Sequence, residues 1–172
     1  MVISSSSKAF GLERARRHNI PTAVLRRRDF AHDDAFSAAV TAELDRYPVD
    51  LVILGGFLKF WKIPRKYEGR VMNIHPALIP MFCGKNFYGH SVHEAVLASG
   101  VKVSGCTVHF ADNVYDHGPI IIQRTVPVLD DDTPETLAKR VFEQECIAYP
   151  EAIRLFAAGR LKIEGRRVRI LP

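Results

Sequence analysis

Asn73 and His75 end the apolar stretch RVMNIHP, and Pro76 follows them immediately. Side chains two residues apart lie on the same side of an extended strand, so this pair is predicted to stand together at a strand's carboxyl end. In open α/β sheets, ligand chemistry usually occurs at that end. An amide N–H and an imidazolium are suited to holding an oxygen that becomes negative when a carbonyl is attacked.

Asp116 lies in the segment HFADNVYDHGPII, in a predicted loop between two strands. An Asp close to a Gly often only forms a turn. If the loop brings Asp116 near His75, the carboxylate would orient the imidazole and favour its cationic form. Asn73, His75 and Asp116 together could serve attack on a carbonyl, with Asp116 assisting departure of the proton. Because no GxSxG motif marks a nucleophilic serine, direct transfer to an external nucleophile is predicted.

Two further groups of residues are weaker candidates for a functional site. His90 and His93 are three residues apart on a predicted helix, but no HExxH motif or third ligand accompanies them, so no metal site is predicted. The segment GFLKFW follows the glycines of an apolar strand. Its aromatic residues either pack in the core, as expected for Phe57, or form the rim of a site for a flat aromatic ligand.

These residues must be positioned by strands that alternate with helices over most of the chain, which indicates an α/β fold with an open sheet. The stretch VDLVILGGF is typical of a parallel strand buried on both faces. Thr133 and Pro134 are a helix cap and a first helical residue, and Pro150 is a candidate point of interruption in the long helix they begin. Phe36, Val40, Leu44 and Tyr47 recur at i, i+4, i+8 and i+11, which predicts a helix near 33–46. Strands are predicted near 2–3, 21–25, 49–57, 70–76, 103–110 and 120–128, further helices near 10–18, 89–99 and 133–158, and a final hairpin turning at 164–165.

The composition bounds the class of protein. The chain has 172 residues, of which 47% are hydrophobic and 25% charged, which predicts one domain over residues 1–172. No signal peptide or membrane-length apolar run is present, and three scattered cysteines predict a reducing cytoplasm without disulfides. The net charge of +5 indicates either ordinary solvated charges on the surface or a surface that attracts a small anionic substrate. Nucleic-acid binding is not predicted, because no recognition motif accompanies the charge.

The segments RVMNIHPALIP, SGCTVHFADNVYDHGPIIIQRTVPV and EQECIAYPEAI resemble the phosphoribosylglycinamide formyltransferase family from about Phe10 to about Ile163. The resemblance implies an open, mostly parallel Rossmann-like sheet with helices on both faces. It also implies transfer of a formyl group from 10-formyltetrahydrofolate to the amine of glycinamide ribonucleotide, by a metal-free monomer or homodimer. The related deformylase carries a stretch more like NIHHSFLP, and methionyl-tRNA formyltransferase has an additional tRNA-binding domain.

The resemblance also assigns roles to residues of this sequence. Asn73, His75 and Asp116 match the catalytic residues, and Glu145 matches the Glu that binds the ribose hydroxyls. His109 matches a recurrent His to which we assign structural support of the site. The folate-lining stretch matches Leu58, Lys59, Phe60 and Trp61, and the backbone around Val114 and Tyr115 is expected to hold the pterin.

The chain departs from the family at its start. The family begins with an apolar strand, a glycine-rich phosphate loop and a helix, whereas MVISSSSKAFGLERA matches the second strand and its helix. The two strands that would flank a missing first strand are expected to keep unpaired backbone groups. Asp33 replaces a common Lys or Arg, for which 26–28 (RRR) could compensate. A wrongly started or truncated enzyme is the favoured explanation, and the alternatives are a rebuilt N-terminus, another amine such as an amino sugar nucleotide, or an inactive folate-binding relative.

Overall fold

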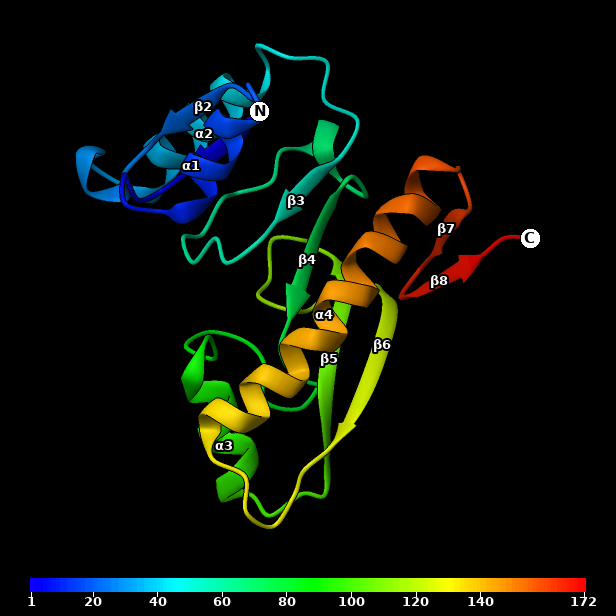
Figure 1. The fold of residues 1–172 in the computed structure, drawn as a ribbon. Coiled ribbons are helices and arrows are strands. Elements are labelled where there is room, and N and C mark those ends of the chain that lie inside the picture. The colour runs from blue at the N-terminus through cyan, green and yellow to red at the C-terminus, as the bar shows by residue number, and fades with distance from the viewer. The chain divides into compact units, whose positions relative to one another are not determined.

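The computed structural model describes residues 1–172, which form two compact units. Unit 1 comprises Met1–Val52 and Gly56–Glu68, and unit 2 comprises Ile53–Gly55 and Gly69–Pro172. Each unit is described by itself, with the element labels of Figure 1. The prediction of one domain over residues 1–172 stays a prediction. None of the helices is long and apolar enough to cross a membrane.

Unit 1 contains a small parallel sheet and two helices. Its elements are β1 (Val2–Ser4), α1 (Phe10–Arg17), β2 (Thr22–Val24), α2 (Asp33–Leu44) and two short 3-10 turns at Arg27–Asp29 and Arg65–Tyr67. Val2 pairs with Thr22 and Ser4 with Val24. On α2, Phe36, Val40 and Leu44 are buried, which confirms the helical spacing predicted for them.

Unit 2 contains most of the sheet and the long C-terminal helix. Its strands lie in the order β3-β4-β5-β6-β8-β7, and α4 packs on β5 and β6 and contacts α3 (Figure 1). The elements are β3 (Val52–Leu54), β4 (Val71–His75), α3 (His90–Ala98), β5 (Val103–Phe110), β6 (Ile120–Pro127), α4 (Pro134–Ala157), β7 (Leu161–Glu164) and β8 (Arg167–Ile170).

The prediction of a mostly parallel sheet is wrong, because the sheet is mixed. The pairs β4/β5, β5/β6 and β7/β8 are antiparallel, and β6/β8 is parallel. The short connections from β5 to β6 and from β7 to β8 return the chain directly, which requires antiparallel neighbours. The α/β class and the open sheet are confirmed, and helices on both faces stay a prediction.

Two local expectations also need correction. The β3 strand is not buried on both faces, since it is an edge strand and Ile53 is 46% exposed. The α4 helix runs through Pro150 without interruption. Pro150 cannot donate a hydrogen bond to the carbonyl of Cys146, but both residues are exposed, so water can satisfy that carbonyl. The Thr133 cap is confirmed by reciprocal bonds with Thr136.

Candidate active site

Asn73 and His75 lie at the carboxyl end of β4, where β4 pairs with β5. Asn73 is opposite His109 and His75 is opposite Thr107 in the antiparallel register. Residues opposite each other project from the same face, so the Asn73 and His109 side chains meet, and Asn73 Nδ2 is 3.3 Å from His109 Nε2. His109 Nδ1 is 2.9 Å from the Phe110 carbonyl, which can only accept, so Nδ1 carries a proton and donates it.

Asp116 is brought to this pair by the loop between β5 and β6. Its Oδ1 accepts from Asn73 Nδ2 at 3.4 Å, and its Oδ2 lies 3.6 Å from His75 Nδ1. The Gly84 amide donates to Oδ2 at 2.9 Å. The backbone of Asp116 is in the left-handed region, with φ of 52°. The structure therefore brings together the three side chains expected to be catalytic, with His109 against them.

His75 is buried, and its ring is held at both nitrogens. Nε2 is 2.8 Å from the Phe82 carbonyl, so Nε2 carries a proton and donates it. Burial lowers the pKa of His75 below its ordinary value, and the opposing charge of Asp116 only partly restores it. The expected raising effect of Asp116 is present, but burial outweighs it.

Asp116 is nearly enclosed, with a side chain 10% exposed. Burial alone raises the pKa of Asp116. Interaction with His109, whose Nε2 lies 3.6 Å from Oδ1, the charge of His75 and the hydrogen bond from the Gly84 amide together outweigh burial and hold the pKa of Asp116 below its ordinary value. The site therefore holds a carboxylate that is ionised at neutral pH against an imidazole that resists a second proton.

Glu145 projects from α4 and is partly buried. Burial raises the pKa of Glu145 to about 7, with no hydrogen bond to offset the loss of water. The pKa of the Cys106 thiol on β5 is raised to about 11 by burial and by the charge of Glu145, which indicates that the carboxylate faces this strand. The carboxylate is a hydrogen-bond acceptor to which no side chain donates.

The residues expected to line a folate site lie in both units. In unit 1, Leu58 is 57% exposed and Lys59 is also exposed, and Phe60 is half-buried. Trp61 is buried. Its Nε1 donates to Thr41 Oγ1 at 3.1 Å, and its ring centroid lies 5.8 Å from that of Tyr67. In unit 2, Val114 and Tyr115 are 57% and 44% exposed on the Asp116 loop. Phe57 stacks on Phe36, as expected for a core residue.

Phe82 and Gly84 are functional candidates that sequence reasoning missed. Their carbonyl and amide contact His75 and Asp116, and both have positive φ, at 50° and 96°. A Gly in this segment was a weak signal for an unusual backbone, but nothing in the sequence marked the Phe82 carbonyl. His93, on α3, is buried and its Nδ1 has no partner. No group of three or more His, Cys, Asp or Glu is arranged to hold a metal ion.

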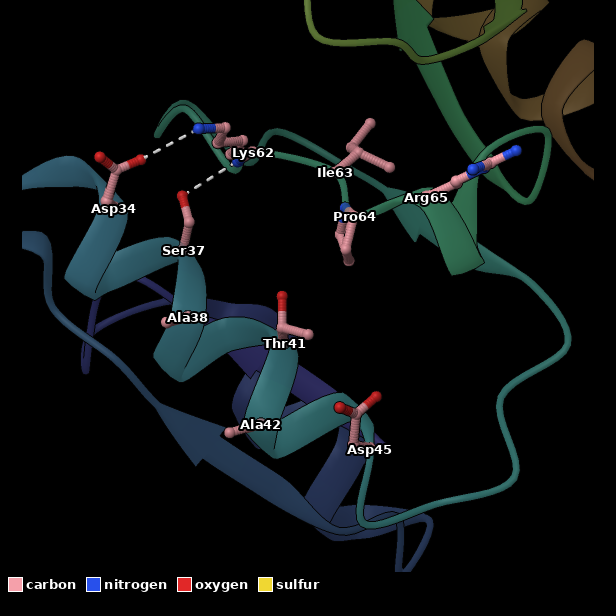
Figure 2. Close-up of a pocket in the computed structure, with 10 residues that line it drawn as sticks. All are labelled: Asp34, Ser37, Ala38, Thr41, Ala42, Asp45, Lys62, Ile63, Pro64 and Arg65. Carbon is pink, nitrogen blue, oxygen red and sulfur yellow. Dashed lines mark hydrogen bonds and ion pairs between the residues drawn. The ribbon is translucent and has the colours of Figure 1, made fainter.

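A surface pocket of about 580 Å³ lies in unit 1, between α2 and the segment 62–65 (Figure 2). Most of its polar groups are already paired: Lys62 binds Asp34 and Ser37, and Thr41 accepts from Trp61. Asp45 accepts from Lys66 and Tyr67. None of the residues predicted to act in the site lines this pocket.

Comparison with known proteins places the chain in a family. The model of the formyl transferase family matches residues 1–153. The trifunctional purine biosynthetic protein adenosine-3 of Gallus gallus is 41% identical over 95% of this chain, and the chloroplastic phosphoribosylglycinamide formyltransferase of Arabidopsis thaliana is 39% identical over 94%. The chain spans only 16% and 56% of those two proteins. The cytoplasmic location and the monomeric or homodimeric state stay predictions.

A solved structure agrees over nearly the whole chain. Glycinamide ribonucleotide transformylase 1 from Symbiobacterium toebii is 46% identical with a TM-score of 0.92, and the match covers 99% of this chain and 80% of that one. The sequence match and the structural match thus agree over both units. This chain therefore belongs to the formyl transferase family and is similar to its phosphoribosylglycinamide formyltransferases.

Proposed function

We propose that this chain is a formyltransferase of purine biosynthesis that carries a formyl group from 10-formyltetrahydrofolate to the amine of glycinamide ribonucleotide. The observation that carries the proposal is the cluster of Asn73, His75 and Asp116 at the end of β4, in a member of the formyl transferase family. The names of the relatives supply the acceptor, since several are phosphoribosylglycinamide formyltransferases.

The residues present fit a folate donor. Bound 10-formyltetrahydrofolate would supply an activated formyl group. Val114 and Tyr115 expose apolar surface beside Asp116, and Leu58 exposes its side chain in unit 1, as expected of side chains that cover a flat ligand. Lys59 and Phe60 follow Leu58 in unit 1, and we assign them to folate binding as well. Trp61 is buried and would act by shaping the segment rather than by contact through its ring.

Asn73 and His75 would hold the formyl oxygen while the substrate amine attacks the formyl carbon. Asn73 offers amide N–H groups, and His75 offers Nε2–H, which now donates to the Phe82 carbonyl. The formyl oxygen would take the place of that carbonyl, so the Phe82 segment must yield when substrate binds. Both donors act on the charge that develops in the transition state.

Asp116 would stabilise the protonated His75 and relay the proton that the amine loses. Its Oδ2 faces His75 Nδ1 at 3.6 Å, so it stabilises a second proton on the imidazole as negative charge grows on the formyl oxygen. The amine loses its proton when the new C–N bond forms and the bond from the formyl carbon to the folate nitrogen breaks. Asp116 is the base that would accept this proton through a water molecule and return it to the folate nitrogen.

Glu145 would bind the ribose hydroxyls of glycinamide ribonucleotide. Its carboxylate has no donor in the fold, and two adjacent hydroxyls would supply donors. Hydrogen bonds to the ionised form would lower the pKa of Glu145, so the ribonucleotide should bind more tightly to the ionised carboxylate. An amino sugar nucleotide would place its hydroxyls differently and gain less from this residue.

The test is formyl transfer to glycinamide ribonucleotide by the wild-type chain, His75→Ala and the exposed control His18→Ala. We expect His75→Ala to lose at least about 100-fold in kcat, the scale of one oxyanion-holding donor, and His18→Ala to match the wild type. Titration of the ribonucleotide and a folate analogue separates the rivals. Binding of the folate analogue alone would indicate a folate-binding relative, and transfer to another amine would refute the assigned acceptor.

A further inference from the structure

The loop between β5 and β6 holds Asp116 in an unfavourable backbone conformation. A residue other than Gly in the left-handed region costs free energy, and surrounding contacts must hold it there. The base of the loop is closed, since the Phe110 amide donates to the Pro119 carbonyl at 2.9 Å. Gly118 passes so close to Phe110 that an added Cβ would lie 1.8 Å from its carbonyl oxygen. The tip of the loop, from 112 to 117, needs support of its own.

A chain of three side chains provides such support. Asp112 Oδ1 accepts from the Val114 amide at 2.9 Å, and Asp112 Oδ2 lies 2.9 Å from His117 Nδ1. His117 Nε2 lies 2.6 Å from Arg166 Nη1. Asp112 precedes Asp116 in the sequence and His117 follows it, so the contact between Asp112 and His117 closes the loop across Asp116.

The chemistry of the groups fixes the direction of each hydrogen bond. A guanidinium only donates, so His117 Nε2 must offer a lone pair to Arg166. The proton of the neutral ring is then on Nδ1, and it is donated to the Asp112 carboxylate. Arg166 thus donates to His117 and His117 donates to Asp112, so the three side chains form one chain of hydrogen bonds with opposite charges at its two ends.

Arg166 reaches this loop from a fixed position. It lies in the turn between β7 and β8, and the next residue, Arg167, pairs with Ile120 of β6. Ile120 directly follows the residue that closes the loop base. The turn is thus attached to the strand that leaves the loop, so the Arg166 side chain can act as a brace.

We propose that Arg166 and His117 are positioning residues, which brace the loop through Asp112 and so hold Asp116 against His75 and Asn73. Neither side chain contacts the reacting atoms, and both act through the backbone of the loop. The catalytic consequence rests on the proposed function, whereas the bracing of the loop does not.

The test compares Arg166→Met, His117→Phe, their double variant and the control Arg167→Met, an exposed Arg of the same hairpin. Amide hydrogen exchange of residues 111–119 measures the brace without reference to activity. We expect exchange to rise about 2- to 10-fold in each bridge variant, as for loss of one or two exposed hydrogen bonds, and no further in the double variant. Arg166→Lys and His117→Gln keep the donor and acceptor pattern and should restore much of the protection.

Formyl-transfer kinetics form the second measurement. We expect kcat to fall by a similar factor in Arg166→Met, with little change in KM for the amine substrate, because Asp116 acts in the transition state. Unchanged exchange in the bridge variants, or an equal rise in Arg167→Met, would overturn the brace. If the wild-type chain transfers no formyl group while exchange responds as expected, the brace stands and the proposed function fails.

Discussion

Replacing Glu145 with Gln should stabilise the fold at neutral and alkaline pH. Burial raises the pKa of Glu145 to about 7 in the folded chain, against an ordinary value of 4.5 that unfolding restores. Below pH 4.5 the carboxyl is protonated in both states and costs nothing. As pH rises, the unfolded chain ionises first, so stability is lost between about pH 4.5 and 7. Gln keeps the shape of the protonated acid and has no charge to lose.

The magnitude follows from the size of that change. At 1.36 kcal/mol per pKa unit, complete desolvation would cost roughly 3 kcal/mol at pH 8. Glu145 keeps part of its surface in water, so we expect a smaller effect, about 1–2 kcal/mol. For a chain of 172 residues this raises Tm by about 2–8 °C.

Urea unfolding at several pH values between 4.5 and 8 measures the effect. Circular dichroism at 222 nm is the appropriate signal, because Glu145 lies on the long helix α4 whereas the single Trp, Trp61, belongs to unit 1. Glu143→Gln, an exposed change on the same helix, is the control and should show no comparable gain. A difference between Glu145→Gln and the wild type that is the same at every pH would refute the reasoning, since only ionisation can make it grow with pH.

Three further substitutions test the fold that positions the site. Tyr149→Phe should cost about 1–2 kcal/mol of unfolding free energy in urea, because the hydroxyl is shared between the carbonyls of Leu54 on β3 and Met72 on β4, which would lose their donor. Gly105→Ala should cost more than about 3 kcal/mol by the same measurement, since its Cβ would lie 1.9 Å from the Arg124 carbonyl oxygen, whereas Ala at the open Gly11 of α1 should be tolerated. Thr133→Ala should cost about 1 kcal/mol in thermal unfolding through loss of the α4 cap, and Thr133→Ser should retain most of it.

Several elements were predictable because their signals are local. The spacing of Phe36, Val40 and Leu44 predicted α2, and the cap at Thr133 predicted where α4 begins. The alternation of Asn73 and His75 predicted that they share a side of β4, and the structure places them together around Asp116. Each of these inferences needs only neighbouring residues.

The direction of the strands was not predictable in this way. A run such as Val71–His75 has the same hydrophobic pattern in a parallel or an antiparallel pair, because the pattern records burial and not the direction of the neighbour. The same holds for Pro150, whose effect on α4 depends on whether water reaches the carbonyl of Cys146. Both outcomes depend on tertiary structure.

Three residues that break local rules, His75, Asp116 and Phe82, lie in the candidate site, and a fourth, Glu145, lies on α4. His75 is a buried imidazole with a lowered pKa, and Asp116 and Phe82 have left-handed backbones although neither is Gly. Glu145 is a partly buried carboxylate with no donor. Each of these features lowers the stability of unit 2, and a stability-driven sequence would replace each one. A ligand with an oxygen to be held by His75 and hydroxyls to be bound by Glu145 would relieve them together, so binding should stabilise unit 2 by more than its contacts with exposed groups alone would predict.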